Sequence, residues 1–316
     1  MGSPFDAIAI ARRSLAAAGI PAGQAAIDAE VLARHVLGWD RAGLAAYGRD
    51  AAPAGFEARF QELVVRRAMR EPVAMIIGRR EFWGLDFDVS HAVLIPRPET
   101  EMIVEEALAF ARMSPCRLAI DVGTGSGCIA IALAHELPGI RVIATDISRA
   151  AIEVAQRNAV NHKLANRIEF RQGDLLDSIY GTADLILSNP PYVAEADTAD
   201  LQPDVVAFEP HTSLFGGTDG LDVVRRLLKE SAAHLASNGC LIVEFGCGQV
   251  AAVRQLAADA GWTVVRIRED LQGIPRTAVL SLVVGVSTTD GSIDSSAVAT
   301  AANDGNRSLG FFSSIL

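Results

Sequence analysis

The 316-residue sequence has few cysteines, few aromatic residues and no long apolar run. Its four cysteines, at 116, 128, 240 and 247, form no C-x-x-C pair and have no histidines at zinc-ligand spacing, so we expect buried thiols and no metal site. The longest apolar stretches, such as 278–286 (AVLSLVVGV), are far shorter than the roughly 18 residues that a membrane span requires. The N-terminus also lacks the basic and apolar regions of a signal peptide. We therefore expect a cytoplasmic protein that does not associate with membranes.

Basic residues are outnumbered by acidic ones, 28 to 38, which gives a formal net charge of −10. Non-specific binding to a phosphate backbone depends on clustered Lys and Arg, so this charge argues against a direct nucleic-acid partner. Half of the residues are hydrophobic, which is enough for one large or two ordinary domains with a true core.

The pattern along the chain divides it into four parts. Residues 1–80 are rich in alanine with apolar positions at helical spacing, and predict a small helical bundle. Residues 81–97 alternate apolar and polar positions around Ser90 and His91 and predict a β-hairpin linker. Residues 286–316 have no periodicity and predict a disordered tail. Three basic residues of the bundle could contact an acidic partner, but we interpret them as part of a solvated helix face: Arg66, Arg67 and Arg70.

Between residues 98 and 285, strand-like segments alternate with helix-like ones. This repetition predicts a doubly wound, mainly parallel α/β sheet, with ligands bound at the carboxyl ends of its strands. Seven segments have the character of strands: RLAIDVG, RVIATD, RIEFRQGD, ADLILSN, CLIVEFG, WTVVRIR and AVLSLVVG. The last two are separated by a linker too short for a helical crossover, so we expect them to pair antiparallel.

The segment Ser-Asn-Pro-Pro-Tyr at 188–192 follows the apolar run ADLIL. A strand cannot continue through two prolines, so it must stop at Asn189. The backbone at Pro190 and Pro191 offers carbonyl acceptors and no donors, which suits a substrate that brings its own N–H groups. An ordinary strand-end turn is the alternative interpretation of this segment.

A glycine-rich turn, AIDVGTGSGCIAIALA at 119–134, joins a predicted strand to a predicted helix. Gly123, Gly125 and Gly127 allow a sharp turn and a close approach of a ligand to the positive end of the helix. The pattern also satisfies G-x-G-x-x-G/A up to Ala130, so a dinucleotide-dependent enzyme stays open as an alternative.

Acidic residues at the ends of three successive predicted strands favour a different ligand. Asp146 lies where a carboxylate reaches the ribose hydroxyls of a bound nucleotide, both in dinucleotide-dependent enzymes and in enzymes that bind S-adenosylmethionine. Asp121 would repel a pyrophosphate but attract an ammonium group, and Asp174 would accept from an adenine amino group. Each aspartate alone is more simply explained as a cap or turn residue. Together they favour S-adenosylmethionine, which carries an ammonium group and no phosphate.

With these motifs, the domain resembles the class I S-adenosylmethionine-dependent methyltransferases that modify planar nitrogens. Residues 80–101 (REFWGLDFDVSHAVLIPRPETE) and 208–228 (FEPHTSLFGGTDGLDVVRRLL) are similar to the peptide chain release factor glutamine methyltransferases, HemK or PrmC. The similarity covers roughly residues 70–284. It implies a Rossmann-like, seven-stranded sheet in a catalytic domain at 98–285, and methyl transfer from S-adenosylmethionine to the side-chain amide of the glutamine in the Gly-Gly-Gln motif of release factors.

The resemblance, with the residue patterns above, gives an expected set of site residues. Cofactor contacts are expected from Asp121, Gly123, Thr124, Gly125, Ser126, Gly127, Asp146, Asp174, Leu175 and Asn189, with Leu175 as a packing contact near the adenine. The substrate glutamine is expected at Asn189, Pro190, Pro191 and Tyr192. Of these, the Asn189 side-chain oxygen and the Pro190 carbonyl would accept the two amide N–H bonds, and the Tyr192 ring would exclude water.

Three alternatives stay open. Glutamine methyltransferases of a large-subunit ribosomal protein share the Asn-Pro-Pro-Tyr motif, although they usually lack the PRPETE tract found here at 96–101. DNA adenine N6-methyltransferases have similar motifs, but duplex recognition needs base flipping and a basic surface. A non-catalytic binding module that docks on the translation machinery is the third alternative, against which the intact glycines and Asn-Pro-Pro-Tyr argue.

Overall fold

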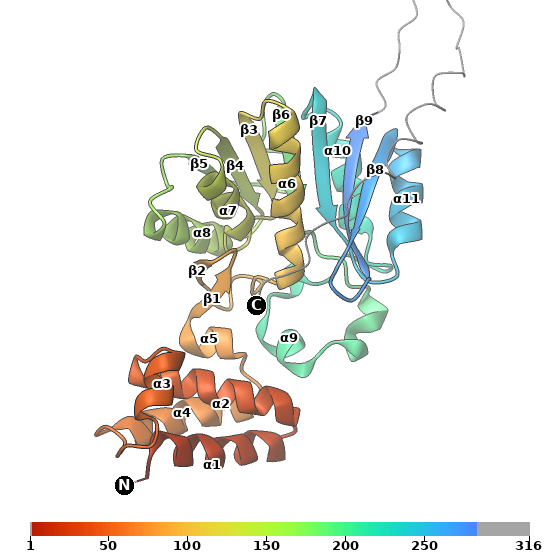
Figure 1. The fold of residues 1–316 in the computed structure, drawn as a ribbon. Helices are drawn as coiled ribbons and strands as arrows, with labels where there is room; N and C mark the ends of the chain where they lie inside the picture. The colour runs from red at the N-terminus through yellow and green to blue at the C-terminus, as the bar shows by residue number, and fades with distance from the viewer. Residues whose placement is uncertain (1, 283–316) are drawn as a thin grey trace, which may run out of the picture. The chain divides into compact units, whose positions relative to one another are not determined.

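The computed structural model describes residues 2–282, so the predicted tail at 286–316 lies outside the described residues. The first 77 residues contain a set of short helices (Figure 1): α1 (Pro4–Ala17), α2 (Ala22–Leu37), α3 (Arg41–Tyr47), α4 (Phe56–Ala68) and α5 (Val73–Ile77). Helix α1 begins with a capping box, in which Ser3 and Asp6 satisfy each other's backbone N–H groups, and Pro4 occupies its first turn. Apolar side chains from these helices form one core around Leu15, Leu32 and Phe56.

A two-stranded hairpin follows, made of β1 (Arg79–Phe82) and β2 (Leu85–Asp88). The predicted hairpin over 81–97 is therefore wrong in its extent, because the chain reverses at Trp83 and Gly84. Both have positive φ, 57° and 69°, which is the geometry of a tight two-residue turn. The alternation beyond Asp88 has another cause: Val89 and Val93 are buried against α8 (Arg149–Asn161) without forming a strand.

The remaining strands form one seven-stranded sheet in the order β5-β4-β3-β6-β7-β9-β8. Their bounds are β3 Leu118–Val122, β4 Arg141–Asp146, β5 Ile168–Gln172, β6 Ala183–Ser188, β7 Leu235–Glu244, β8 Trp262–Glu269 and β9 Pro275–Leu282. The first five are parallel, whereas β9 pairs antiparallel with both β7 and β8. The predicted doubly wound sheet with an antiparallel last pair is confirmed.

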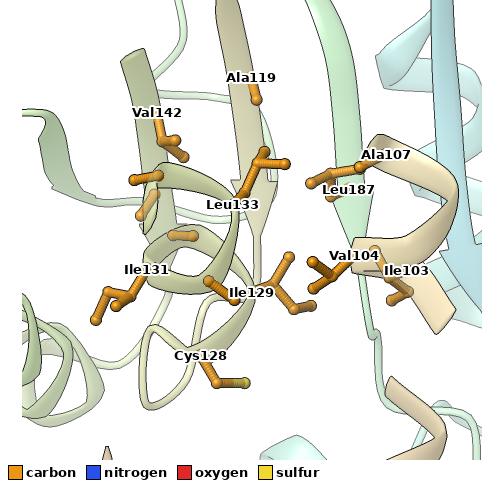
Figure 2. Packing of buried hydrophobic residues seen from close by; sticks show 14 of the residues in the cluster. Ile103, Val104, Ala107, Ala119, Cys128, Ile129, Ile131, Leu133, Val142 and Leu187 are labelled. Atoms are coloured by element: carbon orange, nitrogen blue, oxygen red, sulfur yellow. The ribbon is translucent and has the colours of Figure 1, made fainter. Parts of the chain in front are cut away.

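Helices cover both faces of this sheet. On one face lie α6 (Glu101–Met113), α7 (Cys128–Glu136) and α8, and on the other α10 (Asp222–Ser231) and α11 (Val250–Asp259) (Figure 1). Successive side chains of a strand point to opposite faces of the sheet and belong to different cores. Ala119 packs with α6 and α7, and Ile120 packs with α10 and α11. Figure 2 shows the first of these cores, where Ile129 and Leu133 of α7 lie beside Val104 of α6 in one apolar cluster with strand residues such as Ala119 and Leu187.

Because β3, β4 and β6 are parallel neighbours, their carboxyl ends meet at one edge of the sheet. The segment after β6 runs through η2 (Glu195–Asp200), α9 (Pro203–Phe208) and η3 (His211–Ser213) before α10. Within residues 2–282, no helix is long and apolar enough to cross a membrane. The same part of the chain contains no cluster of three or more His, Cys, Asp or Glu arranged to hold a metal ion.

Candidate active site

The loop between β3 and α7 contains three glycines with positive φ, and they have two different roles. At Gly123 and Gly125, φ is 72° and 55°, and a side chain would point into open space. There the backbone itself forms the wall of a cavity. At Gly127, a Cβ atom would lie 3.1 Å from Ala155 and from Ile131, so this glycine lets the loop pack against α8.

Asp146 is the last residue of β4 and lines the same cavity. Its two carboxylate oxygens accept hydrogen bonds from the backbone N–H of Gly125, at 2.9 Å, and of Ser148, at 2.8 Å. Burial raises the pKa of Asp146, and these two hydrogen bonds oppose the rise. The carboxylate is thus held rigidly, and each oxygen keeps a lone pair for a further donor.

Asp121 lies beneath the glycine loop, fully buried, and does not line the cavity. One carboxylate oxygen accepts from Thr124 Oγ1 at 2.6 Å and from the N–H of Ala130 at 3.2 Å. The other oxygen, Oδ1, has no hydrogen-bond partner among the described residues. Burial raises the pKa of Asp121 to about 7 despite the two hydrogen bonds. The sequence predicts a direct contact between Asp121 and the cofactor, but Asp121 is buried below the loop and away from the cavity wall, which does not support that contact.

Asp174 and Leu175 line the cavity just beyond the end of β5, from which Gly173 separates them. Asp174 accepts a hydrogen bond from Arg226 of α10 at 3.0 Å, a partner that the sequence did not predict. Leu175 has a positive φ of 51°, which is rare for a leucine, and its carbonyl accepts from Thr145 Oγ1 at 3.0 Å. This strained backbone holds the leucine at the cavity wall.

Two cavities meet at the end of β6. Cavity A, of about 360 Å³, is bounded by the glycine loop, Asp146 and Leu175. Cavity B, of about 450 Å³, is bounded by more polar residues, including Glu99, Tyr192, Gln202, Glu244 and Arg276. Residues common to both walls are Leu94, Arg97, Asn189 and Ser213.

Asn189 follows the last residue of β6, Ser188, as predicted from the two prolines. Its Nδ2 atom donates to Thr100 Oγ1 at 2.9 Å, and Thr100 in turn donates to Glu244 Oε2 at 2.8 Å. Glu244, the last residue of β7, also accepts from the Tyr192 hydroxyl, through Oε1 at 3.3 Å. Burial raises the pKa of Glu244 to about 7, and burial also raises the pKa of Tyr192.

The motif at 188–192 is held in place by the segment between α9 and α10. The chain after Tyr192 pairs with this segment through two backbone hydrogen bonds, from Val193 N to Leu214 O at 2.9 Å and from Gly216 N to Val193 O at 3.0 Å. On the other side, Gln249 Nε2 donates to the Tyr192 carbonyl at 2.9 Å. The motif is therefore fixed on both sides by backbone and amide contacts.

The segments 80–101 and 208–228, which carry the family resemblance, contact each other. Glu209 is buried and accepts from Arg97 at 2.5 Å and from the backbone N–H of Ile95 at 3.3 Å. Arg97 lies on the walls of both cavities, so this ion pair fixes part of the wall that they share. Sequence reasoning missed Thr100, Glu209 and Glu244 as site residues, although Thr100 belongs to the PRPETE tract.

Comparisons with known proteins agree with this geometry. The family described as "PrmC N-terminal domain" matches residues 6–78, and "Methyltransferase small domain" matches residues 105–208. A release factor glutamine methyltransferase of Cereibacter sphaeroides is 43% identical over 271 residues, which cover 86% of this chain and 95% of that protein. Another, of Xylella fastidiosa, is 46% identical over 254 residues, which cover 80% and 92%.

Among solved structures, the catalytic domain of human METTL16 in complex with an RNA hairpin has a TM-score of 0.53 at 18% identity, over 71% of this chain and 82% of that one. This likeness concerns the fold. The sheet and the ligand-sized cavity at its carboxyl edge define a class I methyltransferase. The sequence identities to the two relatives define the family within this class: the chain belongs to the family of release factor glutamine methyltransferases. The predicted resemblance is confirmed, and it extends over the N-terminal helices.

Proposed function

We propose that this protein transfers a methyl group from S-adenosylmethionine to the side-chain amide nitrogen of the glutamine in the Gly-Gly-Gln motif of a peptide chain release factor. One observation carries the proposal: the two cavities meet at Asn189, whose side-chain NH₂ group is bound to Thr100 and whose oxygen is left without a partner among the described residues. An acceptor at the junction of a nucleoside-sized cavity and a second, polar cavity fits methylation of an N–H group.

Several features of cavity A support S-adenosylmethionine as its ligand. Asp146 offers a rigid carboxylate for two ribose hydroxyls, and the open backbone at Gly123 and Gly125 leaves room for the ligand. Leu175 supplies an apolar contact for the adenine. When ionised, above its raised pKa of about 7, Asp121 adds negative potential under the loop, which would favour a cationic ligand. When bound, this cofactor supplies an electrophilic methyl group.

The substrate amide enters through cavity B. An amide nitrogen is a poor nucleophile because its lone pair is delocalised into the carbonyl group. Hydrogen bonds from its two N–H groups to the Asn189 oxygen and the Pro190 carbonyl would hold the nitrogen in place and would stabilise the positive charge that develops on it during methyl transfer. The Tyr192 ring packs against the amide plane and excludes water. As the carbon–nitrogen bond forms, the carbon–sulfur bond of the cofactor would break and leave S-adenosylhomocysteine. The alkylated nitrogen is strongly acidic, so it would release its proton to solvent without a dedicated base.

Residues 1–80 serve to dock the release factor in this proposal, and residues 98–285 perform the chemistry. Support for the docking role comes from the Arg67–Asp204 contact, which connects the helices to the wall of cavity B. We place the reaction in the cytoplasm, where release factors act.

The test uses the full chain, labelled S-adenosylmethionine and a purified release factor. We expect one methyl group per release factor, mapped by fragmentation to the glutamine of the Gly-Gly-Gln motif. The matched control is a release factor with that glutamine replaced by alanine, which should take no label. A cell extract serves as a second substrate pool. Label on a large-subunit ribosomal protein, with the release factor unlabelled, would overturn the proposal.

A further inference from the structure

Three polar side chains from distant parts of the sequence form a chain that ends at the proposed acceptor. Glu244 ends β7, Thr100 lies in the 3₁₀ turn η1 (Pro98–Thr100), and Asn189 follows β6. Glu244 and Thr100 are 1% and 2% exposed, so water is excluded from the bond between them. Buried polar groups of this kind depend on one another for hydrogen-bond partners.

The capacities of these groups fix the direction of each hydrogen bond. Above its raised pKa of about 7, the Glu244 carboxylate is ionised and can only accept, so the single hydroxyl proton of Thr100 then points to Glu244 Oε2, 2.8 Å away. The Thr100 oxygen then has only acceptor capacity left for Asn189, 2.9 Å away on the other side. Asn189 must therefore donate to this oxygen through its NH₂ group. The side-chain carbonyl oxygen of Asn189 therefore faces the junction of the two cavities. This orientation follows from which of the three groups can donate and which can only accept a hydrogen bond.

The opposite orientation would oppose the reaction. With the amide rotated by half a turn, Asn189 would present N–H donors to a substrate that also brings N–H donors, and no hydrogen bond would form between them. The Asn189 side chain cannot choose between these orientations by its own shape, because its oxygen and nitrogen ends are nearly the same size. The orientation of the Asn189 amide must therefore be set by a neighbouring group whose own donor direction is fixed.

We infer that Thr100 and Glu244 are positioning residues for methyl transfer, which hold the Asn189 amide with its oxygen toward the substrate nitrogen. Glu244 also accepts from the Tyr192 hydroxyl, so one buried carboxylate orients both polar side chains of the Asn-Pro-Pro-Tyr motif. Neither Thr100 nor Glu244 needs to touch the reacting atoms. The inference rests on the proposed function for its substrate, but the orientation of Asn189 is a property of the free protein.

The direct test is nuclear magnetic resonance on the full chain with labelled asparagine and threonine, at about pH 8.5, where a carboxyl with a pKa of about 7 is ionised. We expect cross-relaxation between the Asn189 NH₂ protons and the Thr100 side chain, and its loss in Asn189→Ala, which assigns the signal. Absence of this contact in the wild-type protein would overturn the inference whether or not the protein methylates a release factor.

The kinetic test compares Thr100→Val, which keeps the shape and removes the hydroxyl, with Thr100→Ser, which keeps the hydroxyl. With release factor as substrate, Thr100→Val should lower kcat by about 10- to 100-fold, as expected when an acceptor is misplaced. Thr100→Ser should restore kcat to within about threefold of wild type, because serine has the same donor and acceptor capacity. Cofactor affinity and melting temperature, measured on each preparation, separate positioning from folding.

A double-mutant cycle shows whether Thr100 acts through Asn189. In an Asn189→Ala background, Thr100→Val should lower kcat no further, because there is no amide left to orient. An equal further loss in that background, or normal turnover in Thr100→Val alone, would overturn the positioning role. A wild-type protein that leaves release factors unlabelled would instead overturn the proposed function, and the resonance test would still decide the orientation.

Discussion

Arg67 of α4 places its Nη1 atom 3.1 Å from a carboxylate oxygen of Asp204 in α9. The same guanidinium group binds Asp28 of α2 through Nε at 2.7 Å, and its side chain is only 5% exposed. Two carboxylates from different helices therefore share one buried cation. Because Leu201, Gln202 and Val205 beside Asp204 line cavity B, this contact connects the helical bundle to the wall of the proposed substrate cavity.

We predict that Asp204→Asn raises KM for the release factor by several-fold and leaves cofactor affinity unchanged. The substitution removes one partner of Arg67 but keeps Asp28, so we expect a loss of about 1 to 2 kcal/mol in the free energy of unfolding, below that of breaking a whole buried pair. The matched control is Glu153→Gln, which breaks the exposed pair Arg149–Glu153 of α8 and should change neither quantity. Equal KM values for Asp204→Asn and wild type would remove this contact from substrate docking.

Asp146→Ala should weaken S-adenosylmethionine binding by roughly 10- to 100-fold, since a hydrogen bond to a charged group contributes about 1.5 to 3 kcal/mol. The loss of support for the glycine loop at Gly125 acts in the same direction. Calorimetric titration of the full chain measures this affinity. Asp177→Ala is the control, because Asp177 is exposed and does not line cavity A. Affinity within twofold of wild type would exclude Asp146 from the cofactor site.

The sequence predicted what depends on local backbone chemistry. The end of β6 before Asn189 follows from the two prolines, and the glycine loop follows from positive φ at Gly123 and Gly125. The sheet was predictable because apolar strands alternate with helices and a short linker forces the last pair to be antiparallel. The hairpin turn at Trp83 and Gly84 was misplaced, because a tryptophan with positive φ leaves no pattern in composition.

Contacts between distant segments were not predictable from one sequence. The interpretation of Arg67 as part of a solvated helix face is wrong, because its partner Asp204 lies 137 positions further along the chain. Thr100 and Glu244 are 144 positions apart, and neither lies in a motif that identifies it as a partner of the other. Periodicity and motif spacing carry no information about such pairs, which only tertiary packing brings together.

Asn189→Ala should lower kcat for methyl transfer by about 10²- to 10³-fold, the usual effect of removing one preorganised electrostatic partner. Cofactor affinity should fall far less, because the glycine loop and Asp146 supply most of the contacts with cavity A. Single-turnover methyl transfer, cofactor affinity and melting temperature should be measured on one preparation. If Asn189 served only as a turn residue, the variant would lose about 1 kcal/mol of stability and turn over normally, which would contradict the acceptor role.

Glu244 gives the stability of the protein a predictable dependence on pH. Its pKa in the folded protein is raised from the usual 4.5 to about 7, mainly by burial and also by the nearby charge of Glu99, and this is the net result after the hydrogen bonds from Thr100 and Tyr192 and the charge of Arg276 oppose the rise. Between these two pH values the folded state binds more protons than the unfolded state. The free energy of unfolding therefore falls as pH rises from about 4.5 to about 7.

Glu244→Gln removes this titration but keeps an oxygen that can accept from Thr100. We expect the fall in unfolding free energy between about pH 5 and pH 8 to be smaller in the variant than in wild type, by on the order of 2 to 3 kcal/mol. Asp121, whose pKa burial also raises to about 7, titrates equally in both proteins and cancels in the comparison. Denaturant titrations at a series of pH values measure the difference. Parallel stability curves for the two proteins would mean that Glu244 is ionised throughout this range, and that the proton of Thr100 is already fixed toward it at pH 5.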